Sequence, residues 1–143
     1  MKIIVERGEK KMLITAMKVK RMIKMNNRLL AIVSITLDEM IAIHDIKIIE
    51  SDHGIFLAMP SRKLGNSFVD VAHPIHQQAR KGIENLVFSA YEVVKNENYG
   101  DAYFVLTSTN ASSFMDQSLS DFEIEYAIAM EKIQLHYQKD EDD

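Results

Sequence analysis

The sequence predicts an α+β fold: an antiparallel β-sheet meander followed by a packed helix, with an extra C-terminal helix. In the first half of the chain, apolar residues alternate with other residues over several short runs, and turn-forming residues separate the runs. Further on, apolar residues recur every three or four positions in two long segments, which is the spacing of a helix with one buried face. Strands grouped ahead of helices are typical of α+β proteins.

Four runs predict the strands of the meander, at residues 12–20, 28–37, 40–50 and 54–59. The last two flank the turn-prone residues 51–54, so we expect a β-hairpin there. This hairpin is expected to deliver residues 60–63 as a short basic loop. A further short strand is expected at residues 68–72.

Two apolar stripes predict the helices. The first runs along residues 77–96 and comprises Ile83, Leu86, Val87, Ala90, Tyr91 and Val94. The second predicts a helix at about residues 120–138, where Ser120 and Glu123 fit a capping box. Its stripe comprises Phe122, Tyr126, Met130, Ile133 and Tyr137. We therefore expect a domain at residues 1–98 and an acidic C-terminal extension at residues 99–143.

The composition limits the compartment and the class of protein. A chain of 143 residues fits one domain with a core of its own. It contains no cysteine, which rules out a disulfide framework and a thiolate metal site. No apolar run approaches the ~18 residues that a membrane-spanning helix needs, and the start lacks the apolar core of a signal peptide. The expected location is cytoplasmic, with no membrane partner.

Charge is distributed unevenly along the chain. The net charge is −4, but residues 1–99 hold 15 Lys and Arg against 11 Asp and Glu, whereas residues 100–143 hold 2 against 10. A basic body with an acidic tail fits a binding surface for an acidic partner, and a solvated acidic terminus without a function fits equally well.

The motifs give no sign of catalysis. His44, His53, His73 and His76 show no metal-ligand spacing, and Asp45 follows His44 within a strand, so that their side chains point to opposite faces unless a bulge intervenes. Glycine-rich phosphate loops and nucleophile elbows are absent from the sequence. We expect no enzyme activity, no cofactor and no metal.

Basic residues in the first hundred positions are candidates for contacting phosphates, although an ordinary solvated surface is the simpler interpretation. Few aromatic residues are interleaved with them, which favours backbone contact over base readout. The set comprises Lys18, Lys20, Arg21, Lys24, Arg28, Lys47, Arg62, Lys63, Arg80 and Lys81.

Four blocks of residues resemble a known bacterial family. In order they are AIVSITLD at 31–38, IHDIKII at 43–49, GIFLAMPSRK at 54–63 and DVAHPI at 70–75. Their order and spacing are similar to those of SpoVG, the stage V sporulation or septation protein G family. The resemblance covers residues 12 to about 95. It implies a small α+β protein that forms homodimers, binds DNA or RNA, acts as a regulator and has no catalytic activity.

Carried over by position, the family's basic loop falls on Arg62 and Lys63, and the basic residue near the start of its helix falls on Arg80, with Lys81 beside it. Together with Lys47, these are the candidate nucleic-acid-binding residues. The chain departs from the family pattern at 64–67 and at the helix start, and residues 99–143 have no counterpart in the short members. The alternative function is a non-catalytic protein-interaction module that recruits a partner protein through the C-terminal helix or a sheet edge.

Overall fold

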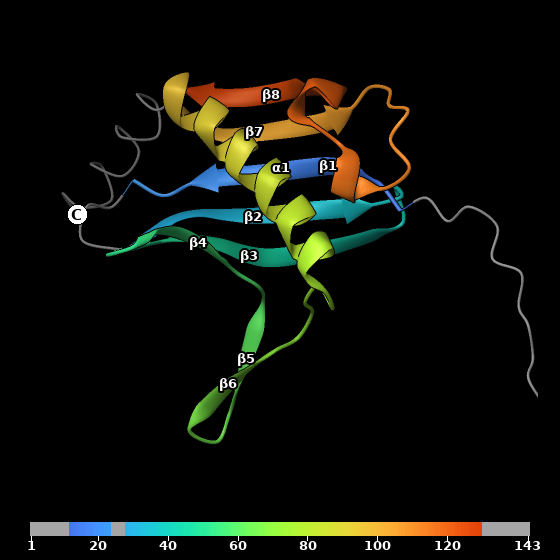
Figure 1. Ribbon diagram of the computed structural model, residues 1–143. Helices are drawn as coiled ribbons and strands as arrows, with labels where there is room; N and C mark the ends of the chain where they lie inside the picture. The colour runs from blue at the N-terminus through green and yellow to red at the C-terminus, as the bar shows by residue number, and fades with distance from the viewer. Residues whose placement is uncertain (1–11, 24–27, 130–143) are drawn as a thin grey trace, which may run out of the picture.

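A computed structural model describes residues 12–23 and 28–129, and it confirms the α+β class. Six antiparallel strands form one sheet in the order β4-β3-β2-β1-β7-β8, and the helix α1 (Gln77–Asn96) crosses one face of it (Figure 1). The strands are β1 (Ile14–Arg21), β2 (Leu29–Leu37), β3 (Ile41–Ser51), β4 (Gly54–Ala58), β7 (Tyr99–Leu106) and β8 (Phe122–Ala129). A separate hairpin of β5 (Ser61–Leu64) and β6 (Ser67–Asp70) projects away from the sheet. Two 3₁₀ turns, η1 (Phe114–Asp116) and η2 (Leu119–Asp121), precede β8.

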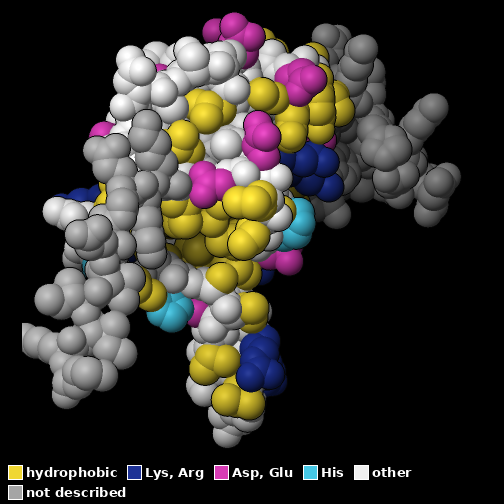
Figure 2. Space-filling model, turned by 90° about the vertical axis from the view of Figure 1, so that its right-hand side faces the viewer, with side chains coloured by type: hydrophobic (Ala, Val, Ile, Leu, Met, Phe, Trp, Pro, Cys, Tyr) yellow, Lys and Arg dark blue, Asp and Glu magenta, His cyan; other side chains and the backbone are white. Residues whose placement is uncertain are grey.

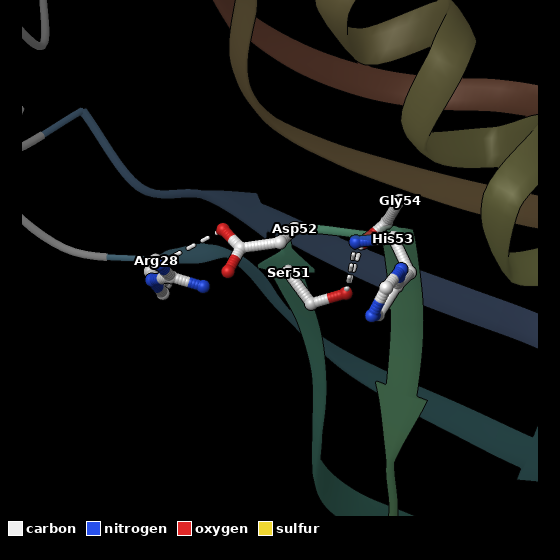
Figure 3. A network of polar contacts seen from close by, with 5 residues as sticks. All are labelled: Arg28, Ser51, Asp52, His53 and Gly54. Atoms are coloured by element: carbon white, nitrogen blue, oxygen red, sulfur yellow. Dashed lines mark hydrogen bonds and ion pairs between the residues drawn. The ribbon is translucent and has the colours of Figure 1, made fainter.

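The first four strands form the expected meander, in which each pairs with the next. The expected hairpin turn joins β3 to β4. In this turn, Ser51 Oγ donates a hydrogen bond to the Gly54 carbonyl at 2.8 Å and accepts one from the His53 backbone N–H at 3.3 Å (Figure 3). Gly54 has a φ of 117°, which L-residues with side chains rarely adopt, so the turn requires glycine. Arg28 reaches Asp52 in the same turn through an exposed ion pair of 3.3 Å.

The core lies between α1 and the inner face of the sheet. All six positions of the predicted helical stripe are buried. His76 caps the helix, because its Nδ1 accepts a hydrogen bond from the Ala79 backbone N–H at 3.1 Å. The fully buried side chains on the sheet include Met17, Val19, Val33, Ile35, Ile46, Ile48, Leu57 and Phe104. In the described part of the chain, no helix has the length and apolar character needed to cross a membrane.

The predicted C-terminal helix is wrong over the residues that the structure describes. Residues 122–129 form the edge strand β8, which pairs with β7. Phe122 and Tyr126 are spaced by four, which fits a helix, but Phe122, Ile124, Tyr126 and Ile128 also alternate with smaller or charged residues, which fits a strand. Pairing with β7 decides between the two patterns. Residues 130–138 of the predicted helix lie outside the described residues.

The predicted basic loop at 60–63 is also wrong, because residues 61–64 form a strand. β5 pairs with β6 around a tight turn at Gly65, whose φ is 64°. The pairing aligns Arg62 with Val69 and Lys63 with Phe68. β-branched and aromatic residues favour strands, and β6 contains both kinds, whereas β5 contains neither. The composition of β5 therefore does not predict a strand, and its pairing with β6 makes it one.

Residues 99–129 are built into the same sheet and core as the rest of the described chain. β7 lies between β1 and β8, with Ala102 and Phe104 buried. The segment between β7 and β8 returns to the helix, where Phe114 is buried against Gly82, and to β1, where Gln117 hydrogen-bonds to the backbone. The division of the chain at residue 98 stays a prediction.

Candidate nucleic-acid interface

Arg62 and Lys63 lie on the projecting hairpin of residues 61–70, here called the arm. Every residue of the arm is exposed to solvent. Neighbouring side chains of a strand point to opposite faces, so Arg62 and Lys63 present a cation on each face of the ribbon. Figure 2 shows the arm with Lys and Arg side chains beside hydrophobic ones, below the body of the molecule. Within the described ranges, neither cation forms an ion pair.

Arg80 is held in place by two interactions. Its Nη2 donates a hydrogen bond to the Leu57 carbonyl at 2.8 Å, and its Nε donates one to Glu84 Oε1 at 3.0 Å. The first contact ties the start of α1 to β4, and in the second, within α1, the glutamate offsets the arginine charge. Arg80 therefore has a structural role that its position in the sequence does not reveal, and its side chain keeps only 37% of its surface exposed.

Lys81 and Lys47 lie in two different surroundings. Lys81 is exposed on α1 and lines a shallow polar hollow with Gln78, Asn85 and Asp116. Lys47 is exposed on the face of the sheet that α1 does not cover, where it pairs with Ala58 of β4. The five candidate residues thus fall on the arm, at the start of the helix and on the open sheet face, not in one cluster.

The histidines have structural roles at two positions. His44 Nδ1 lies 2.9 Å from Ser34 Oγ across the β2–β3 pair, and His76 caps α1. Asp45 has a φ of 62° at an irregularity in the β2–β3 register, so the bulge considered from the sequence does occur. Among residues 12–23 and 28–129, no three acidic or histidine side chains gather closely enough to hold a metal ion.

An apolar hollow lies near the base of the arm, and sequence reasoning did not find it. Its volume is about 390 Å³, and residues from β2, β3, α1 and the segment between β6 and α1 line it. Exposed apolar residues surround it, including Ile75 at 86% and Val71 at 66% of full exposure. Figure 2 shows hydrophobic side chains gathered between the body and the arm. The one available signal was the mostly apolar stretch at 71–75, in which four of five residues are apolar and which fits neither a strand nor a helix period.

The segment that carries these features matches a known family. The SpoVG family model matches residues 12–93. A SpoVG protein of Finegoldia magna is 52% identical over 81 residues, which cover 56% of this chain and 74% of the relative. A SpoVG protein of Clostridium novyi is 47% identical over 78 residues, which cover 54% of this chain and 78% of the relative. Both relatives carry names that connect them with septation and neither is named as an enzyme. Since the family model matches more than half of the chain, the chain belongs to the SpoVG family.

Proposed function

We propose that this protein is a homodimeric regulatory protein that binds the phosphate backbone of DNA or RNA and has no catalytic activity. The observation that carries the proposal is the arm, which holds the exposed residues Arg62 and Lys63 away from the body. Neither cation forms an ion pair with any residue that the structure describes, so both are available to replace the counterions of a phosphate chain. Lys47 and Lys81 add exposed charge, while Arg80 contributes mainly by fixing the helix start.

The arm and the apolar hollow support a homodimer. An isolated two-stranded hairpin is at best marginally stable in water, and this one exposes Phe68 at 71% and Leu64 at 55%. Large exposed apolar areas are typical of protein–protein contacts. A second copy supplies both an arm and a hollow, so a two-fold arrangement satisfies the two surfaces at once.

Binding is tested by fluorescence anisotropy with labelled 20-nucleotide single strands and duplexes of DNA and of RNA, each titrated between about 50 and 200 mM salt. We expect binding that weakens steeply with salt. In a dimer the two arms present four cations, so the double variant Arg62→Gln/Lys63→Gln should reduce the slope of log K against log salt by roughly 3 to 4 on duplex DNA. Lys95→Gln, an exposed lysine in the last turn of α1, is the control for a change of charge alone. An unchanged slope in the double variant would exclude the arm as the binding element.

Dimerisation is tested separately by sedimentation equilibrium. Phe68→Ser should shift the protein toward monomer, because it removes an exposed apolar anchor of the arm. Ile124→Ser is the matched control, since Ile124 is partly exposed on β8, at the opposite edge of the sheet from β4. Equal association in both variants would contradict an arm-mediated dimer.

A protein-interaction module remains the second candidate, supported by the exposed apolar residues around the hollow and by the edge strand β8. It predicts association that is insensitive to salt and survives neutralisation of the arm cations. Phe122 belongs to the apolar stripe through which the expected C-terminal helix would recruit a partner. It is unsuitable for testing the protein-interaction function, because its side chain is buried in the core and its replacement would destabilise the fold.

A further inference from the structure

The face of the sheet opposite α1 carries a distinct set of side chains. On β1, Met17 and Val19 are fully buried under the helix, whereas Lys18 and Lys20 are exposed on the other side. Among the described residues, no helix or strand lies over this second face (Figure 1). The sheet therefore has one solvent-exposed face, which we call the open face. It is built from alternate residues of β8, β7, β1, β2 and β3.

Two tyrosines on the open face are stacked on each other. Tyr103 of β7 and Tyr126 of β8 are register partners, and their rings lie 5.4 Å apart between centroids with an angle of 12° between their planes. Tyr126 keeps 46% of its surface exposed. A cross-strand aromatic pair also stabilises a sheet, so the pair alone does not identify a ligand.

The neighbours of the tyrosine pair supply the second observation. Lys18 is the register partner of Tyr103 on the next strand, so one row across the sheet reads Tyr126, Tyr103, Lys18. The adjacent row places Lys20 and Lys47 on either side of Ile32. Rows on the same face of a sheet are separated by two residues, or roughly 7 Å. Asp101 is the register partner of Lys20 on β7, whereas the register partners of Lys18 and Lys47 are uncharged, so we take Lys18 and Lys47 as the principal cations of this face.

We infer that the open face binds single-stranded nucleic acid, with bases stacking on the tyrosine pair and phosphates contacting Lys18 and Lys47. Base faces are accessible in single strands and hidden in duplexes, and flat sheets with exposed aromatic residues and flanking cations are suited to them. A protein partner fits less well, because lysines are depleted from the cores of protein interfaces. This inference rests on the proposed nucleic-acid function and adds a second surface to it. Both tyrosines lie outside residues 12–93, so this surface depends on the part of the chain beyond the family match.

The test compares the full-length double variants Tyr103→Leu/Tyr126→Leu and Tyr103→Phe/Tyr126→Phe. Leucine keeps apolar bulk without a stacking ring, and phenylalanine keeps the ring. Anisotropy with labelled single-stranded RNA, single-stranded DNA and duplex DNA should show a loss of single-strand affinity in the leucine variant, on the order of 10-fold or more, with duplex affinity retained. The phenylalanine variant should bind single strands as the parent does. Circular dichroism checks that both variants are folded.

Tyrosine emission gives a second readout, since the chain contains no tryptophan. Binding of an unlabelled single strand should quench the parent's emission, and the phenylalanine variant should lose most of that quenching while keeping its affinity. Lys18→Gln should weaken single-strand binding more than Lys95→Gln does. If the leucine variant keeps the parent's single-strand affinity, the open face is not the site, whereas the proposed function stands as long as the arm variants still lose binding. If the parent binds duplex but no single strand, this inference alone fails. If it binds neither at low salt, both fail.

Discussion

The Gln117 side chain forms hydrogen bonds with the backbone at the start of β1, and replacing it tests how the segment after β7 stabilises the fold. The β1–β7 ladder ends at Ala16 and Val105, two residues short of Ile14. At that point the Gln117 side chain takes the place of a strand: its Oε1 accepts a hydrogen bond from the Ile14 N–H at 2.8 Å, and its Nε2 donates one to the Ile14 carbonyl at 3.1 Å. Both contacts are buried, and they join residues 103 positions apart in sequence.

The variant Gln117→Leu should lower the free energy of unfolding by about 2 to 4 kcal/mol. It leaves one buried N–H and one buried C=O of Ile14 without partners, and each unsatisfied group costs about 1 to 3 kcal/mol. Burial of the added apolar surface offsets part of that loss. Gln117→Glu should cost a similar amount at neutral pH, because it keeps the acceptor but replaces the donor with a carboxylate that faces the carbonyl oxygen of Ile14.

Urea denaturation followed by circular dichroism measures both variants by linear extrapolation, at one fixed protein concentration because dimerisation contributes to apparent stability. Gln78→Leu is the matched control, since Gln78 is exposed in the first turn of α1 and its replacement should change the stability by less than about 0.5 kcal/mol. A loss below about 1 kcal/mol for Gln117→Leu would refute the reasoning, since it would mean that Ile14 finds other partners.

Two further predictions concern η1, the first its contact with α1 and the second the hydrogen bonds at its own start. Gly82→Ala should destabilise the protein in urea denaturation, because the added Cβ would lie 2.9 Å from the Met115 Cα, even though alanine favours helices. Ser89→Ala, at an exposed position on α1, is the control. A stabilising effect of Gly82→Ala would contradict the close packing. Hydrogen bonds from the backbone N–H of Ser113, and to a smaller extent of Ser112, lower the pKa of Asp116. The ionised Asp116 therefore contributes to the stability of the fold above the ordinary Asp pKa of about 3.9, and this contribution is lost as pH falls through the lowered pKa. Asp116→Asn should therefore be less stable than the parent at neutral pH, and thermal unfolding should show the gap closing below about pH 4; a gap that persists in acid would contradict this role.

The helix α1 and the first four strands could be predicted from the sequence because their signals are local. Each of the six apolar positions assigned to the helix is buried, and the turn at 51–54 has its glycine where the left-handed conformation occurs. In these elements the hydrophobic period and the turn chemistry agree, so no long-range information is needed.

The strand β8 could not be predicted in the same way, because its sequence fits two periods. Tyr103 and Phe104 are neighbours on β7, but their register partners on β8, Tyr126 and Ile124, are two residues apart. This irregularity places Tyr126 on the open face while Phe122 enters the core. A spacing of four between Phe122 and Tyr126 thus reflects a bulge and not a helical turn. The choice depends on the exposed edge of β7, which is a property of the assembled sheet.

The sequence names candidate residues for nucleic-acid binding but does not indicate how they are arranged in space. The sequence marks Arg62, Lys63 and Arg80 as cations of equal standing. Only the fold shows that Arg80 is tied to the Leu57 carbonyl, 23 positions away, while the other two extend from the body on the arm. Contacts over such separations have no local signature, so charge in the sequence overstates the charge available to a ligand.

The place of β7 in the sheet decides how the acidic C-terminal extension can be studied. β7 covers the edge of β1 and contributes Phe104 to the core, while Phe114 and Gln117 close the end of the same core. Removing residues 99–143 would therefore expose the hydrogen-bonding edge of a central strand together with apolar core surface, and a loss of binding after truncation would report unfolding. Point substitutions at exposed positions such as Glu123 and Glu125 leave those contacts in place. They separate the effect of acidic charge on nucleic-acid affinity from the structural contribution of the strands that carry it.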